Sequence, residues 1–171
     1  MEEMDLKALV EKFKDKQFSL MERLILSNDG TNVTLLSVIF QTPIQVRVVD
    51  QIEHPDRIVR LVYLETENLV VGKARSTILV GSVPGGNTPA NSPEVLGLVR
   101  EKALGLGHIA TRLGIRTERT LVSFGADELS FWRTYQMVGE GLWYQIQEWF
   151  PRAIYNGVMA AWKWPRETGG A

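Results

Sequence analysis

Hydrophobic and polar residues alternate with a period of two along much of this chain, a pattern typical of β-strands that bury one face. The alternation is found at residues 44–48, 58–64, 69–80, 117–124, 129–138 and 142–150. Thr66-Glu67-Asn68 separates the second run from the third, and Gly139-Glu140-Gly141 separates the last two. Short polar or glycine-containing turns between alternating runs predict β-hairpins.

A period nearer to that of a helix is found in three other segments. Residues 1–15 carry apolar side chains at helical spacing between lysines and glutamates, which predicts an amphipathic helix. Residues 33–40 follow a segment rich in turn and N-cap residues and predict a short buried helix. Ser92-Pro93-Glu94 predicts the start of a helix that ends near Leu104, and the glycines that follow predict a short turn or second helical fragment.

Strands outnumber helices and follow one another in hairpins, so the pattern predicts an α+β fold with a single antiparallel β-sheet and its helices on one side. A length of 171 residues fits one domain with a sizeable core. We expect this domain at residues 1–155, followed by a C-terminal tail at residues 156–171 that contains Trp162 and Trp164. These aromatic side chains could pack on the domain or contact a partner.

The composition narrows the possible functions. Lysine and arginine number 19 against 20 acidic residues, for a net charge of −1, so no general attraction to nucleic acid or to an anionic membrane is expected. Cysteine is absent, which excludes disulfides and thiolate chemistry. The acidic N-terminus does not resemble a signal peptide, and we expect a cytoplasmic protein without an integral membrane segment. His54 and His108 lack metal-ligand spacing, and no phosphate-binding glycine motif occurs, so neither a histidine metal site nor a nucleotide cofactor is expected.

Four charged residues fall among apolar neighbours when side chains are assigned to alternate faces of each strand. Arg60, Arg75 and Arg133 share the parity of aliphatic or aromatic residues in their runs, and Glu148 lies in the middle of the most apolar face of the last run. An unpaired buried charge costs several kcal/mol, so each must find a partner or a ligand. We expect Arg133 to be structural or exposed at the rim.

Two interpretations of the other three charges remain open at this point. Arg60 or Arg75 could pair with Glu148, or the arginines could extend outward along the sheet. Alternatively, the two guanidinium groups could bind the carboxylates of a ring-shaped dianion while Glu148 acts as an acid or base in a dry pocket.

The ordered set of short motifs resembles the chorismate pyruvate-lyase family. Arg60 and Arg75 lie at the separation of that family's two site arginines, and the last run ends in Glu148-Trp149-Phe150-Pro151, similar to the family's E-x-F-x-P ending. The LxxDGxxT-like segment at residues 26–34 and the Leu106-Gly107 pair fall in the family's order. The resemblance covers about residues 20–155.

The resemblance implies an enzyme that eliminates pyruvate from chorismate and leaves 4-hydroxybenzoate, without a cofactor. It implies a single antiparallel sheet with helical flaps over a buried ligand pocket. Arg60 would hold the ring carboxylate, Arg75 would hold the enolpyruvyl carboxylate or Glu148, and Glu148 would handle the protons. Leu106 would contribute a backbone contact and Val33 would line the lid.

Two other functions fit the same patterns. Ligand-sensing domains of some bacterial transcription regulators resemble this fold and bind small carboxylates without turnover. A structural or partner-binding protein would explain the tryptophans of the tail, although it assigns no role to the charges on the strand faces.

Overall fold

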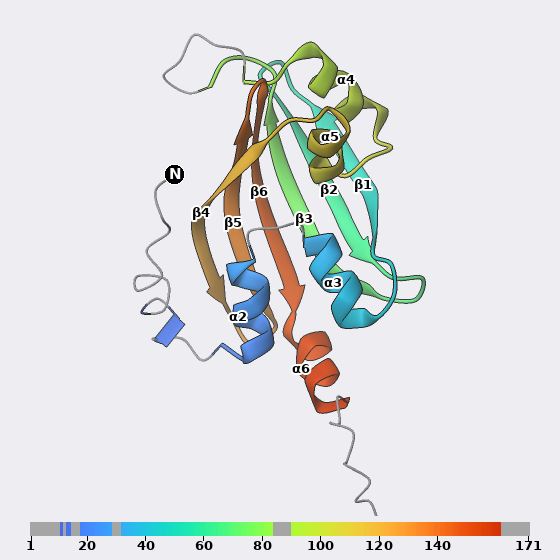
Figure 1. The fold of residues 1–171 in the computed structure, drawn as a ribbon, viewed down its shortest axis with the longest axis vertical. Coiled ribbons are helices and arrows are strands. Elements are labelled where there is room, and N and C mark those ends of the chain that lie inside the picture. Colours follow the sequence, from blue (N-terminus) through green and yellow to red (C-terminus); the bar gives the residue numbers. More distant parts are fainter. Residues whose placement is uncertain (1–10, 12, 15–17, 29–31, 84–89, 162–171) are drawn as a thin grey trace, which may run out of the picture.

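Six strands form one antiparallel sheet in the computed structural model, which describes residues 11, 13–14, 18–28, 32–83 and 90–161 (Figure 1). The spatial order of the strands is β1-β2-β3-β6-β5-β4. Their bounds are β1 Gln45–Glu53, β2 Arg57–Glu65, β3 Val70–Leu79, β4 Thr117–Ala126, β5 Ser130–Gly139 and β6 Leu142–Pro151. Each strand predicted from the period of two is therefore present, and the predicted α+β class is confirmed.

Five helices accompany the sheet in the described part of the chain. They are α2 Leu20–Ser27, α3 Asn32–Phe40, α4 Pro93–Glu101, α5 Leu106–Arg112 and α6 Arg152–Ala161. Figure 1 shows α2 to α5 on one face of the sheet and α6 at its lower end. The helix expected at residues 1–15 lies almost wholly outside the described residues, and α6 crosses position 155, at which the domain was expected to end.

The two halves of the chain repeat the same order of elements. Each half contains two helices followed by three strands, and the halves join through the antiparallel pair β3 and β6 at the centre of the sheet. Ser19 and Ser92 cap α2 and α4. Arg60 and Arg133 lie in the middle strands of the two halves, and each follows the capping serine of its own half at the same separation in sequence. No sequence repeat marks this approximate twofold arrangement.

The predicted helix start at Ser92 is confirmed, because the Ser92 hydroxyl accepts a hydrogen bond from the Val95 amide. The helix ends at Glu101, earlier than expected, where Lys102 adopts a left-handed conformation with φ of 60°. Helix α2 was not predicted. It begins with a capping box in which Ser19 and Glu22 exchange side-chain and backbone hydrogen bonds, and this box satisfies two amide groups of the first turn.

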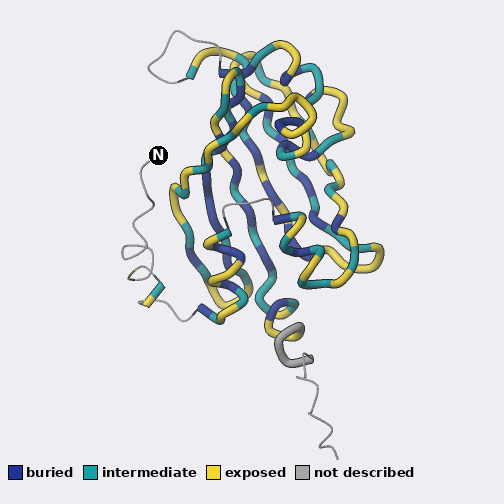
Figure 2. The backbone as a smooth tube through the Cα atoms, viewed as in Figure 1, coloured by how far each residue is buried: buried dark blue, intermediate teal, exposed yellow. Residues whose placement is uncertain are grey.

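The core fills the space between the helices and the inner face of the sheet (Figure 2). Buried and less buried residues alternate strictly along β2 and β6, so that one face of these strands is covered and the other remains partly open. Helix α3 covers less than expected for a buried helix, because Leu36 is buried whereas Val38 is 71% exposed.

Arg60 is a structural member of this core. Its side chain is fully buried and donates hydrogen bonds to the Gln51 side chain and to the carbonyl oxygens of Val99 and Leu104, near the C-terminus of α4. Helix C-termini leave carbonyl groups without intrahelical donors, and a guanidinium group satisfies them well. Burial lowers the pKa of the Arg60 guanidinium. Arg60 therefore fastens the α4–α5 segment to the sheet.

Arg60→Met is expected to lower the free energy of unfolding by about 1–3 kcal/mol, because it leaves buried carbonyl oxygens without donors. Arg75→Met is the matched control, since Arg75 is exposed on the neighbouring strand, and it should change stability by at most about 0.5 kcal/mol. Urea denaturation followed by circular dichroism measures both. Equal losses in the two variants would contradict this role for Arg60.

Candidate functional site

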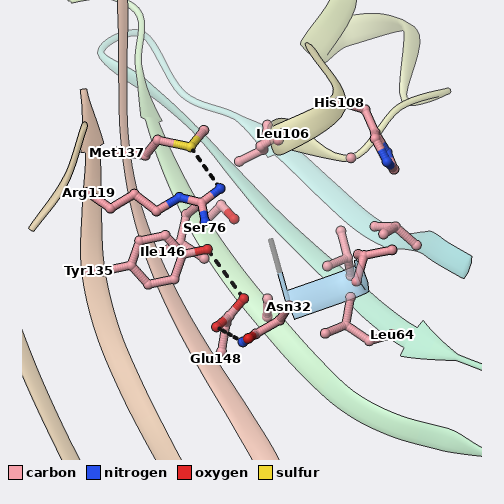
Figure 3. A pocket seen from close by; sticks show the side chains of 16 residues that line it. Asn32, Leu64, Ser76, Leu106, His108, Arg119, Tyr135, Met137, Ile146 and Glu148 are labelled. Carbon is pink, nitrogen blue, oxygen red and sulfur yellow. Dashed lines mark hydrogen bonds between the residues drawn. The ribbon is translucent and has the colours of Figure 1, made fainter. Parts of the chain in front are cut away.

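A cavity lies between the inner face of the sheet and the starts of α3 and α5. Both halves of the chain line it, with apolar side chains from β1, β2, β3, β5 and β6. Its polar members are Asn32, Ser76, His108, Arg119, Tyr135 and Glu148. Figure 3 shows Glu148, Tyr135 and Arg119 along one side of the cavity and His108 at a distance from them.

Glu148 is the carboxylate of this cavity and is almost completely buried. Its Oε2 accepts hydrogen bonds from Asn32 Nδ2 at 2.7 Å and from Arg133 Nε at 2.8 Å. Its Oε1 accepts a longer bond, 3.3 Å, from the Tyr135 hydroxyl. A carboxylate oxygen can accept two such bonds, so Oε1 retains the capacity to accept a proton or a hydrogen bond from a ligand.

Tyr135 supplies a neutral donor beside the carboxylate. Burial, followed by the nearby charge of Glu148, raises the pKa of the Tyr135 phenol well above its ordinary value. The hydroxyl therefore stays protonated at physiological pH and donates to Glu148. This bond helps to fix the direction in which the carboxylate faces the cavity.

Arg133 binds Glu148 from outside the cavity. It forms a buried ion pair with Glu148 at 2.8 Å, and its Nη1 donates to the carbonyl oxygens of Ile25, Leu26 and Asn28 at the end of α2. Of the two roles expected for Arg133, structural or exposed at the rim, the structural one is found, because only 3% of the residue is exposed. Arg133 thus links the end of α2 to the Glu148 carboxylate.

Arg119 brings a positive charge to the same side of the cavity from β4. Its guanidinium carbon lies 5.7 Å from the centre of the Tyr135 ring, and its Nη2 lies 3.8 Å from Met137 Sδ. The side chains along this wall therefore follow the order Arg119, Tyr135 and Glu148 (Figure 3). The wall has a cationic end and an anionic end.

The structure brings together three of the five residues predicted for the site. Glu148, Val33 and Leu106 all line the cavity. Arg60 does not line it, because its three nitrogen donors bind the Gln51 side chain and the carbonyl oxygens of Val99 and Leu104 in the adjacent core. Arg75 also lies elsewhere, exposed on the opposite face of the sheet and paired in register with Gln147.

The expected meeting of Arg60, Arg75 and Glu148 is therefore not found. The physical reason for Arg75 is a change of phase in β3, where Val71 and Gly72 are both buried in succession beside an irregularity in the β2–β3 register. Parity counted from Val71 then assigns Arg75 to the wrong face. The carboxylate's arginine is Arg133, which faces Glu148 directly across the β5–β6 pair.

Asn32, Arg119 and Tyr135 were not predicted as site residues. A signal existed for two of them, since Tyr135 shares a strand face with Arg133, and Arg119 shares one with Leu121 in the β4 run. The position of Asn32 at the start of α3 depends on how α3 packs on the sheet, which no local pattern encodes. Hydrogen bonding to Glu148 then explains why Asn32 is buried.

Within the described residues, no group of three or more histidine or acidic side chains is arranged to hold a metal ion. No helix of that same part of the chain has both the length and the apolar character needed to cross a membrane. Comparison with protein-family models and with curated proteins finds no match to this chain.

Proposed function

We propose that the chain is a chorismate pyruvate-lyase, which converts chorismate into 4-hydroxybenzoate and pyruvate in the cavity described above. The observation that carries the proposal is a buried carboxylate, Glu148, that faces an otherwise largely apolar cavity with one oxygen available. The resemblance of the strand motifs to that family supports the same conclusion.

The reaction needs little chemical assistance, because its product is aromatic. The bond between ring carbon 3 and the ether oxygen breaks, ring carbon 4 loses its hydrogen as a proton, and that electron pair completes the aromatic ring. The departing enolpyruvate takes up one proton and becomes pyruvate. Protons balance, and no oxidant or reductant is consumed.

Glu148 is the catalytic residue of this proposal. Its Oε1 accepts the ring proton, while Arg133 and Asn32 hold Oε2 in a fixed position. A base that is already oriented contributes through proximity as well as basicity. Exclusion of water by the apolar walls around bound substrate would strengthen the electrostatic interactions of the site and keep the enolpyruvyl group away from side reactions.

Val33 and Leu106 line the cavity at the first turns of α3 and α5, and in this proposal they would lie beside the ligand. The two helices would then cover the bound substrate, which would enter as they separate. Arg60 and Arg75 do not contact the substrate in this proposal. Arg60 supports the cover, and Arg75 faces away from it.

Purified full-length protein mixed with chorismate tests the proposal. We expect equimolar release of pyruvate, followed by coupled reduction with lactate dehydrogenase, and of 4-hydroxybenzoate, followed by chromatography. Tight binding of 4-hydroxybenzoate without any turnover would instead support a ligand-sensing domain. Absence of both binding and turnover would refute the proposal.

A further inference from the structure

We infer that Arg119 binds the ring carboxylate of the ligand and so fixes the direction in which the ligand lies in the cavity. The inference rests on the proposed function of the cavity, and it moves the anchoring role from Arg60, on the second strand, to a residue of the edge strand β4.

The first reason is position. Arg119 lines the same cavity as Glu148, with Tyr135 between them: the guanidinium lies 5.7 Å from the Tyr135 ring centre, and the Tyr135 hydroxyl lies 3.3 Å from Glu148 Oε1. A ligand lying along Tyr135 would reach both charged groups with its two ends. Figure 3 shows the guanidinium and the carboxylate on this common wall.

The second reason is electrostatic. A carboxylate placed beside Glu148 would face a like charge in a site of low polarity, which is strongly unfavourable. The same carboxylate beside Arg119 would form charge-assisted hydrogen bonds with a planar donor group. The ring carboxylate of 4-hydroxybenzoate therefore belongs at the β4 end, and its hydroxyl group belongs beside Glu148.

The third reason is the character of the surface between these two ends. Ile146, the register partner of Tyr135, presents an apolar side chain there, and Met137 lies at the cationic end with its Sδ 3.8 Å from Arg119 Nη2 (Figure 3). Methionine adapts its shape and makes favourable contacts with aromatic rings. A six-membered ring carrying a carboxylate at one end fits this order of cationic, apolar and anionic surface.

Two buried arginines lie outside the cavity. Arg133 binds Glu148 and three carbonyl oxygens on the far side of the carboxylate, and Arg60 binds Gln51 and the carbonyl oxygens of Val99 and Leu104. Neither lines the cavity. Among the described lining residues, Arg119 is the guanidinium that can meet the ligand.

Binding of 4-hydroxybenzoate and of its neutral isostere 4-hydroxybenzamide, measured by isothermal titration calorimetry on the full chain, tests the inference. We expect the wild type to prefer the benzoate by about 10- to 100-fold, as a charge-assisted pair implies. Arg119→Gln should remove this preference, and Arg119→Lys should keep part of it. Arg116→Gln, an exposed arginine close by in sequence, is the matched control and should keep all of it.

An unchanged preference in Arg119→Gln, an equal loss in Arg116→Gln, or no preference in the wild type would overturn the inference. Circular dichroism shows whether Arg119→Gln is folded. If it is unfolded, the benzoate preference of Arg119→Lys, compared with that of the wild type, decides the inference. Turnover of chorismate is scored separately. A benzoate preference that depends on Arg119, without release of pyruvate, would refute the proposed lyase activity alone. Turnover of chorismate with a benzoate preference that does not depend on Arg119 would refute this inference alone.

Discussion

Glu148→Gln is expected to lower kcat for pyruvate release from chorismate by about 100- to 10,000-fold, the range contributed by a positioned general base. The amide keeps the size of the side chain and an oxygen that can accept from Arg133, so the fold should survive. It cannot accept the ring proton. The loss should therefore fall on kcat, with a smaller effect on the affinity for 4-hydroxybenzoate.

Glu140→Gln is the matched control, because Glu140 lies in the exposed turn between β5 and β6 and should leave kcat unchanged. Circular dichroism and thermal unfolding of both variants separate a chemical effect from a loss of structure. A folded Glu148→Gln variant with wild-type kcat would exclude Glu148 as the base. A group of the substrate itself would then have to accept the ring proton.

Arg133→Met is expected to have the largest effect on stability. It leaves the Glu148 carboxylate buried without its ion-pair partner and leaves carbonyl oxygens at the end of α2 without a donor. Breaking a buried pair on one side costs about 3–5 kcal/mol. Urea denaturation at neutral pH should show a loss of this size. It should exceed the loss for Arg60→Met, because Arg60 donates to an amide side chain and to carbonyl oxygens rather than to a carboxylate.

The double variant Arg133→Met with Glu148→Leu provides the second measurement. Removing both charges removes the uncompensated carboxylate, so much of the lost stability should return. A double variant less stable than Arg133→Met alone would show that Glu148 is held mainly by Asn32 and Tyr135. A single variant as stable as the wild type would show that the ion pair contributes nothing.

The sheet could be predicted because its residues obey local rules. Period-two alternation and short turns depend only on neighbours in sequence, and they indicated the pairs β2–β3 and β5–β6 correctly. Helix α2 could also have been found, since Ser19 and Glu22 have the spacing of a capping box. Helix α6 has no comparable start signal.

The site could be predicted only in part, for reasons that differ between residues. Glu148 was found because its strand keeps a strict alternation to the end. Arg75 was misplaced because one change of phase in β3 reverses every face assignment after it. Arg133 could have been paired with Glu148 from the register that the tight turn at residues 139–141 imposes. Arg119 and Asn32 meet the others only through packing between distant segments.

The approximate twofold arrangement has a consequence for stoichiometry. In one half, Arg60 faces Ser76 across the strand pair, and in the other, Arg133 faces Glu148 at the corresponding place. Both Ser76 and Glu148 point into a single chamber shared by the halves. The two similar halves therefore provide one cavity carboxylate rather than two. Each polypeptide should accommodate one ligand, in one direction only.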